Sequence, residues 1–272
     1  MGNYIFDGIN AFDSPLFIKK SATENTINAL QDGVTITAIF GTVTNPQNLY
    51  DWNSQTTCFL SSGAFLTGVI IDLGAGITKT CDTLILNNYS CSTNYLTTLE
   101  LQGSNNNITY TSIKSTEIAG NYDLILIKGT NSTAYRYYRV YFFNRGTGDN
   151  TIGEMVLCNS SNLIYVPMPA GVQSIVNNYS EKVAFNELID GGFIGAITSV
   201  KYGATYGYEW LPQSDRDNLK TLKDSKTDFA VIPSPQATNE IYHVYWTNPW
   251  DFSFTDKYEN AGYTGTIEVR EL

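Results

Sequence analysis

The residues with the clearest binding chemistry are aromatic and amide side chains that stand together in two short polar segments. One segment contains Tyr50, Asp51, Trp52 and Asn53, and the other spans residues 87–90. A sugar site needs an aromatic ring that stacks on the apolar face of a pyranose, and amide or acidic groups that bond its hydroxyls. The first segment therefore predicts a glycan-binding loop. The alternative is that Trp52 closes one end of the fold and the asparagines cap turns.

Side chains suited to catalysis are scarce. The single histidine, His243, lies in the alternating segment 242–246, where an imidazole is more often an ordinary strand residue than a general base. The sequence contains no phosphate-binding loop, nucleophile elbow or paired-histidine motif. Its 26 carboxylates include no motif that fixes two of them at the separation used by glycosidases. We therefore expect no enzymatic activity.

The cysteines do not indicate a metal site. They lack the paired short spacings of zinc ligands, which leaves three interpretations open: small core residues, free thiols, or an occasional disulfide. We favour buried core residues, because cysteine behaves as a small hydrophobic side chain. The four positions are Cys58, Cys81, Cys91 and Cys158.

The charge distribution argues against nucleic acid and membrane partners. The net charge is −10, and no cluster of Lys and Arg interrupts it, so no surface for a phosphate backbone is expected. No segment approaches the roughly 20 apolar residues that span a bilayer. The first residues also lack the basic and apolar regions of a signal peptide, so we expect a chain made in the cytoplasm without membrane insertion.

The composition predicts a mostly β protein. Tyr and Phe are abundant, at 19 and 13 residues, and ring side chains fit a half-buried pleated surface. Apolar and polar residues alternate in seven short segments separated by turn residues, a pattern typical of a β-sandwich or jelly roll. The segments are 34–40, 68–73, 83–86, 98–101, 124–127, 137–143 and 154–157.

A basic and aromatic segment, residues 135–141, could in principle bind an anion. Strict alternation places Arg136 and Tyr138 on one face of a strand, and Arg139 and Tyr141 on the other. We interpret this as ordinary strand patterning.

Four patches occur in order along the chain, at residues 69–74, 101–104, 135–140 and 152–157. Together they resemble the discoidin-like (coagulation factor 5/8 type C) branch of the galactose-binding-like β-sandwiches. Asn107 and Tyr110 stand where that family often has Gly and Trp. The resemblance implies a binding or adhesion module whose loops at one end hold the ligand, and Tyr50–Asn53 matches the stretch before the family's "IDLG" strand.

The resemblance also implies one cofactor, a structural calcium ion held by backbone carbonyls and an early carboxylate. Asp51 is the candidate oxygen ligand, although the chain has no EF-hand-like loop. No other cofactor is expected.

The chain divides into three parts by composition. Residues 1–30 are expected to form an arm or edge strand, residues 31–160 the discoidin-like sandwich, and residues 161–272 a small β domain, either a barrel or an α+β fold. A proline-containing connection at 159–171 separates the last two. One helix is predicted at 214–223, with Ser214 as N-cap and a buried face formed by Leu219 and Leu222.

The last part of the chain, roughly residues 195–272, contains a helix with Leu219 and Leu222 on one face, the strand segments 229–233 and 242–246, and a terminal strand at 263–271. This order resembles that of small β-barrel proteins of bacteriophage tails, in the minor-tail and distal-tail group. A barrel of this size is not expected to bury five large rings, so we predict an assembly interface there. The interface residues are Trp210, Trp246, Trp250, Phe252 and Phe254.

Two functional hypotheses follow. The first is a structural virion protein of a tailed bacteriophage, a tail or baseplate component assembled in the host cytoplasm. Its partners would be copies of itself and other tail proteins, and its sandwich would project toward host-surface glycan for attachment. The alternative is a free-standing carbohydrate-binding or adhesion module.

Overall fold

The structure is a computed structural model that forms two compact units. The first unit comprises Met1–Tyr165 and Ala230–Ile241, and the second comprises Val166–Phe229 and Tyr242–Leu272. Of the predicted connection at 159–171, residues 167–171 lie outside the described residues, and the part before them forms the short helix η2 (Ser160–Asn162) and the strand β14 (Leu163–Tyr165). The structure describes residues 4–7, 15–20, 28–31, 33–53, 55–61, 66–92, 96–144, 149–166, 172–187, 193–234, 240–257 and 260–272.

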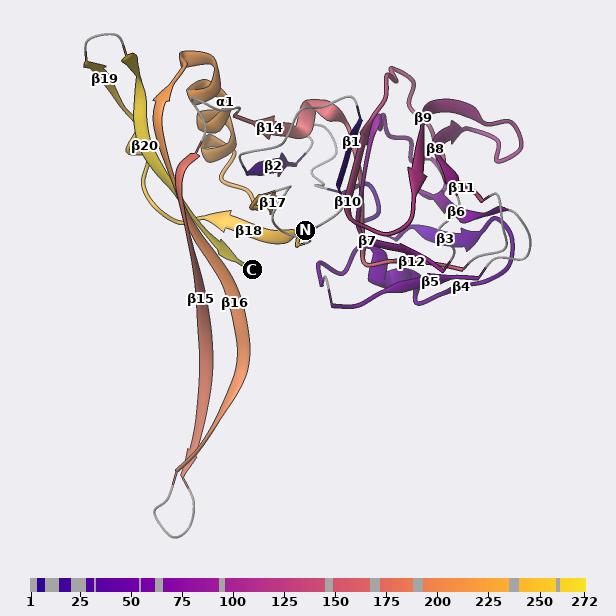
Figure 1. The fold of residues 1–272 in the computed structure, drawn as a ribbon, viewed down its shortest axis with the longest axis horizontal. Coiled ribbons are helices and arrows are strands. Elements are labelled where there is room, and N and C mark those ends of the chain that lie inside the picture. Colours follow the sequence, from indigo (N-terminus) through magenta and orange to yellow (C-terminus); the bar gives the residue numbers. More distant parts are fainter. Residues whose placement is uncertain are drawn as a thin grey trace. The chain divides into compact units, whose positions relative to one another are not determined.

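The first unit is a β-sandwich of two sheets (Figure 1). One sheet has the order β1 (Tyr4–Asp7), β10 (Tyr122–Lys128), β7 (Thr83–Cys91), β12 (Asn150–Ile152), β5 (Cys58–Leu60) and β4 (Val43–Thr44), with β13 (Glu154–Cys158) also paired to β7. The other has the order β3 (Thr35–Ala38), β6 (Leu66–Asp72), β11 (Tyr137–Asn144), β8 (Leu96–Ser104) and β9 (Thr111–Ala119).

The main core fills the space between these two sheets. Val69 and Ile71 of β6 belong to the same buried cluster as Leu84 and Leu86 of β7. Alternation along each strand supplies these residues, since successive side chains point to opposite faces of a sheet.

The sheet that contains β7 is buried on its second face as well. Ile85, between Leu84 and Leu86, belongs to a separate buried cluster with Leu16 and Ile18 of β2 (Leu16–Lys19). In this unit β2 lies between β14 (Leu163–Tyr165) and the β17 strand (Phe229–Ile232). Burial on both faces explains why residues 124–127 form a continuous apolar run in place of an alternating one.

The seven predicted strands are all present, so the mostly β prediction is confirmed. Each contains or overlaps one strand of the sandwich, namely β3, β6, β7, β8, β10, β11 and β13. The two asparagines that follow the predicted strand 83–86 are turn residues by type, but they form no turn, because β7 continues through them to Cys91. Three of the discoidin-like patches lie on the neighbouring strands β6, β11 and β8, and the fourth on β13 of the opposing sheet.

The second unit is an open sheet with a helix. Its strands run in the order β18 (Tyr242–Trp246), β20 (Asn260–Glu271), β16 (Phe193–Leu211) and β15 (Val172–Glu187), with β19 (Ser253–Lys257) beside β20. Pairing of β16 with β20 starts at Gly203, so the tip of the β15–β16 hairpin continues beyond the sheet, as Figure 1 shows. The unit is therefore α+β rather than a closed barrel.

The predicted helix is α1 (Gln213–Asp224), and its buried residues are Leu219 and Leu222, as predicted. The predicted N-cap is wrong, because the helix begins before Ser214 and Pro212 occupies the cap position without a side-chain hydrogen bond. Proline suits this end of a helix, since its missing N–H would have had no intrahelical partner there.

All four cysteines are buried free thiols. Burial raises the pKa of the Cys58 thiol to about 12. They act as small core side chains of the first unit.

Tyr138 provides a stability test of the sandwich core. Its side chain is fully buried, and its hydroxyl accepts a hydrogen bond from the Cys81 N–H at 2.9 Å and donates one to the Lys79 carbonyl at 2.5 Å. Tyr138→Phe removes both bonds and should lower the free energy of unfolding by about 1–3 kcal/mol, measured by urea denaturation. Tyr137→Phe, at the half-buried neighbouring position, is the control and should change it by less than about 0.5 kcal/mol. Equal losses would contradict the role of the hydroxyl.

Candidate functional site

The predicted glycan loop folds around one carboxylate, that of Glu154 at the start of β13. The loop follows the short helix η1 (Pro46–Leu49), whose Leu49 is fully buried and anchors it. The Asn53 N–H lies 2.6 Å from Glu154 Oε1 and 3.0 Å from Asp51 Oδ1. The Thr56 hydroxyl donates to Asp51 Oδ2 at 2.9 Å. Carboxylate and hydroxyl oxygens from distant parts of the chain therefore meet at this point.

Glu154 is unusual because it is a buried acid. It is 0% exposed, and its Oε2 has no hydrogen-bond partner in the described part of the chain. The pKa of Glu154 is raised to about 9. Burial is the largest cause, and the neighbouring Asp51 carboxylate is the second. An ionised Glu154 thus needs a positive charge that these side chains do not provide.

The donors at this point are all oxygens, the kind of ligand that calcium takes. Calcium takes six to eight oxygen ligands, a mixture of carboxylates, carbonyls and hydroxyl or water oxygens. The carboxylates of Asp51 and Glu154 would hold it, with the Thr56 hydroxyl and the Asn53 carbonyl close by. Within the described residues, no group of three or more His, Cys, Asp or Glu side chains could hold a metal ion, so an ion here would have only two carboxylates and would depend on carbonyl, hydroxyl and water oxygens for its other ligands. The ion would neutralise both acids and fix the loop.

The two aromatic residues of the loop lie partly buried against different apolar clusters. Tyr50 packs against the core between the two sheets, and Trp52 packs against the cluster that contains Leu16 and Ile18. Trp52 has a backbone φ of 58°, in the left-handed region that a bulky side chain rarely adopts. Asp51 and Asn53 are exposed. The four predicted residues therefore stay together, but their aromatic rings diverge.

The second polar segment of the sequence is not a loop. Residues 87–90 lie within β7, where Asn87 is fully buried and Tyr89 is 1% exposed. The Tyr89 hydroxyl donates to Asn150 Oδ1 at 2.8 Å, which satisfies it inside the fold. The prediction of sugar-binding groups here is therefore wrong for Tyr89, because the strand turns its ring into the core.

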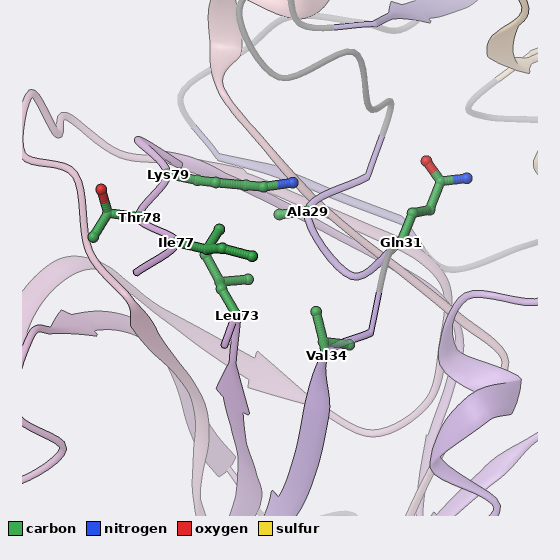
Figure 2. A pocket seen from close by; sticks show the side chains of 7 residues that line it. All are labelled: Ala29, Gln31, Val34, Leu73, Ile77, Thr78 and Lys79. Carbon is green, nitrogen blue, oxygen red and sulfur yellow. The ribbon is translucent and has the colours of Figure 1, made fainter. Parts of the chain in front are cut away.

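A pocket of about 230 Å³ opens at one end of the sandwich, beside the last residue before β3 and the first residue after β6. Figure 2 shows Lys79 reaching across it above the apolar side chains of Leu73, Ile77 and Val34. No aromatic ring is among its described lining residues, so it does not offer the stacking surface of a sugar site.

The segment 135–141 forms the start of β11 and the turn before it. Tyr138 and Val140 are fully buried, whereas Arg139 and Tyr141 lie on the outer face of the sheet, as alternation predicts. The alternation did not reveal that Arg139 stacks on Tyr110, a residue of the β8–β9 hairpin, with its guanidinium carbon 4.1 Å from the ring centroid.

Three of the five predicted interface aromatics stack on one another in the second unit. The ring centroids of Trp246 and Trp250 are 6.0 Å apart, and those of Trp250 and Phe252 are 4.6 Å apart. Cationic groups of α1 lie over this stack, with Lys220 5.8 Å from the Trp250 ring and Lys223 5.2 Å from the Trp246 ring. Helix α1 therefore contacts Trp246 and Trp250, two of the residues for which the sequence predicted a partner protein.

The two remaining predicted interface residues differ from each other. Phe254 is 60% exposed, and its ring meets Tyr263 edge-on at 5.4 Å. Trp210 is half-buried, with a φ of 60° at an irregular point of the β16–β20 pairing. Phe254 is therefore the member of the set that remains open to solvent.

His243 lies on β18 and pairs with Asp228, with 2.5 Å between Nε2 and the carboxylate. Both side chains are largely covered, at 22% and 24% exposure. The pair joins β18 to the segment that follows α1, a structural role within the second unit. No helix among the described residues is long and apolar enough to cross a membrane.

No protein-family model matches this chain, and no curated protein matches it. Solved structures do resemble part of it. A GH29 fucosidase of Ruminococcus gnavus, solved with fucose, matches with a TM-score of 0.36 and 16% identity over 49% of this chain and 26% of the fucosidase.

Two smaller structures match over nearly their whole length. Chitosan-binding module 1 of a chitosanase/glucanase from Paenibacillus sp. IK-5 has a TM-score of 0.38 and 18% identity over 48% of this chain and 97% of the module. The module CpGH89CBM32-6 of Clostridium perfringens has a TM-score of 0.38 and 17% identity over 49% of this chain and 99% of its own. At these TM-scores the likeness carries no inference about this chain.

Proposed function

We propose that this chain is a non-catalytic carbohydrate-binding protein whose first unit holds a glycan at the loop of Tyr50, Asp51, Trp52 and Asn53. The observation that carries the proposal is the left-handed backbone of Trp52, with its φ of 58°. Such strain costs on the order of 1–3 kcal/mol and tends to be kept where it positions a functional side chain. Here the hydrogen bonds from Asn53 to Asp51 and Glu154 hold the strained turn.

Each loop residue has a distinct role in this proposal. Trp52 offers a partly exposed ring for stacking on a pyranose, and the exposed Asn53 amide bonds sugar hydroxyls. Asp51 acts with Glu154 in holding calcium, which fixes the loop from below. Tyr50 supports the loop through its contact with the core.

The test is binding of the full chain to a panel of neutral oligosaccharides, measured by isothermal titration calorimetry with calcium present. Trp52→Ala should weaken binding about tenfold, equivalent to about 1.4 kcal/mol of lost ring stacking. The control is Phe40→Ala, which removes another exposed ring, 46% exposed, from the first unit. Unchanged binding by the Trp52 variant, or an equal loss in the Phe40 variant, would refute the site.

The bacteriophage-tail hypothesis stays a prediction, as do a virion location, tail-protein partners and self-association through residues 195–272. It predicted an assembly interface because the five large aromatic side chains of residues 195–272 were expected to remain partly exposed. The cation–π contacts of α1 with Trp246 and Trp250 weaken that expectation. The carbohydrate-binding alternative has more support, because hydrogen bonds from Asn53 to Asp51 and Glu154 fix the loop on which it depends.

A further inference from the structure

One arginine on the outer face of the five-stranded sheet is held between tyrosine rings. The guanidinium carbon of Arg139 lies 4.1 Å from the ring centroid of Tyr110 and 5.2 Å from that of Tyr141. Tyr137, two residues before Arg139 on β11, lies on the same face by alternation. One side of its ring is covered by the Arg136 guanidinium, whose carbon lies 4.7 Å from the ring centroid. We name Tyr110, Tyr137, Arg139 and Tyr141 the arginine–tyrosine strip.

The charge of Arg139 is not neutralised by a described acid. Its Nε donates to the neutral Gln102 Oε1 at 2.6 Å, and no ion pair joins it to any residue in the described ranges. The nearby Arg136 differs, because its guanidinium binds both oxygens of Asp72 at 2.7 and 2.8 Å. The strip therefore contains one uncompensated arginine, with a compensated arginine beside it, in a chain whose net charge is −10.

The two rings and Gln102 also fix the direction of the guanidinium. Stacking on Tyr110 and Tyr141 holds its plane, and the bond to Gln102 holds its Nε edge. A guanidinium presents its N–H groups as a planar fork that matches a carboxylate in a bidentate geometry. Because these contacts exist before any ligand arrives, little side-chain entropy is lost on binding.

The surroundings of the strip suit an extended ligand that runs along β11. Outward side chains on a strand recur about every 6.6–7 Å, so such a ligand meets a ring at Tyr137, the cation at Arg139 and a ring at Tyr141. On the β6 side, the residue paired with Tyr141 is Gly68, which adds no side chain beside the ring. Beyond Tyr141 the face continues with Phe143, which is 47% exposed.

Two acids limit the charge of this face. Asp72 is paired with Tyr137 on the β6 side, and its carboxylate is bound by Arg136. Glu100 is paired with Tyr141 on the β8 side, and its charge acts on the Tyr141 hydroxyl. It forms no ion pair with Arg139 among the described contacts. An anionic group is therefore favoured at the Tyr137 and Arg139 end of the strip.

We propose that the arginine–tyrosine strip binds an acidic polysaccharide, with a sugar carboxylate on Arg139 and sugar rings packed beside Tyr137 and Tyr141. The inference rests on the proposed carbohydrate-binding function, but it uses a face of the sandwich distinct from the Trp52 loop. Charge complementarity selects this occupant over a neutral glycan, and the succession of ring, cation and ring selects a chain over a single sugar.

The experiment compares polygalacturonate with the same polymer after reduction of its carboxyl groups, using affinity gel electrophoresis of the full chain. Wild-type protein should be retarded at least tenfold more strongly by the acidic polymer. Arg139→Gln should abolish that difference, and Arg139→Lys should restore only part of it, because an ammonium lacks the planar fork. Lys226→Gln, an exposed residue of the second unit, makes the same change in net charge and should have no effect.

Each outcome decides between the two sites. If both polymers retard wild-type protein equally, the inference is wrong, and no variant is needed to show it. Retained preference for the acidic polymer in Arg139→Gln also overturns it. If Trp52→Ala loses neutral oligosaccharides but keeps the acidic preference, both sites stand. If wild-type protein binds neutral oligosaccharides and no acidic polymer, the loop site stands alone. If wild-type protein binds only the acidic polymer, and Arg139→Gln does not bind it, the strip site is supported and the loop site is refuted.

Discussion

Calcium is expected to raise the unfolding temperature of this chain strongly at pH 8 and only slightly at pH 5. The reason is the pKa of Glu154, which burial and the Asp51 carboxylate raise from 4.5 to about 9. Between these two values the folded state binds one proton more than the unfolded state. Without calcium, the contribution of Glu154 to stability is therefore fully favourable only at low pH, and it falls as pH rises through this window.

A calcium ion reverses this trend because it takes the place of the proton. Its binding requires the ionised carboxylate, so its apparent affinity should fall about tenfold for each pH unit below about 9. At free calcium about a hundred times Kd, the stabilisation should be about 2.7 kcal/mol. Thermal unfolding followed by circular dichroism, with calcium or with a chelator, at pH 5 and pH 8 measures both effects.

Glu154→Gln is the informative variant, since it keeps the shape of the side chain and removes the titrating group. It should abolish the calcium effect and flatten the pH dependence between pH 5 and 9. The matched control is Glu117→Gln on β9, an exposed acid that should behave as wild type. Calcium stabilisation that persists in Glu154→Gln, or a wild-type stability that does not change with pH, would exclude the calcium site.

Replacement of Gly262 by alanine is expected to destabilise the second unit by about 3 kcal/mol through overpacking at a point that cannot relax. A Cβ at this position would lie 2.5 Å from the carbonyl carbon and 2.6 Å from the Cα of Trp210. These are backbone atoms, so no rotamer change can move them away. Trp210 is itself constrained, with a φ of 60°, next to a shift in the register of β16 and β20.

Urea denaturation of Gly262→Ala measures this cost. The neighbouring substitution Ala261→Ser, at an exposed position of the same strand, is the control and should change the free energy of unfolding by less than about 0.5 kcal/mol. If Gly262→Ala unfolds at the wild-type urea concentration, the close approach of β16 and β20 at Trp210 is not required for the fold.

The proposed glycan loop and the arginine–tyrosine strip differ in how they could be recognised in the sequence. The loop is a run of four consecutive residues, and its content of rings, amide and acid is visible without any structure. The strip depends on Tyr110, which is 29 positions before Arg139 in the numbering and reaches it only because β8, β9 and β11 share a sheet. A stacking contact across strands leaves no local pattern.

Alternating or continuously apolar segments, bounded by turn residues, were sufficient to locate the sandwich strands. Each of the seven segments, such as 68–73 and 137–143, overlaps an observed strand, because the pleat requires a period of two wherever one face is buried. The same rule failed at residues 87–88, where two asparagines look like a turn. Asn87 is tolerated inside β7 because the Gly153 N–H bonds its carbonyl, and so the strand continues.

The sequence by itself determined the mostly β class, the position of α1 and the grouping of Tyr50, Asp51, Trp52 and Asn53, because these depend on local periodicity and composition. Only the tertiary structure decided that Glu154, about a hundred residues later, meets Asp51 inside the fold. It also decided that residues 230–241 join the first unit, with Ala230 and Ile232 in its second buried cluster. The physical reason is that burial and charge proximity are properties of folded space, and neither has a period along the chain.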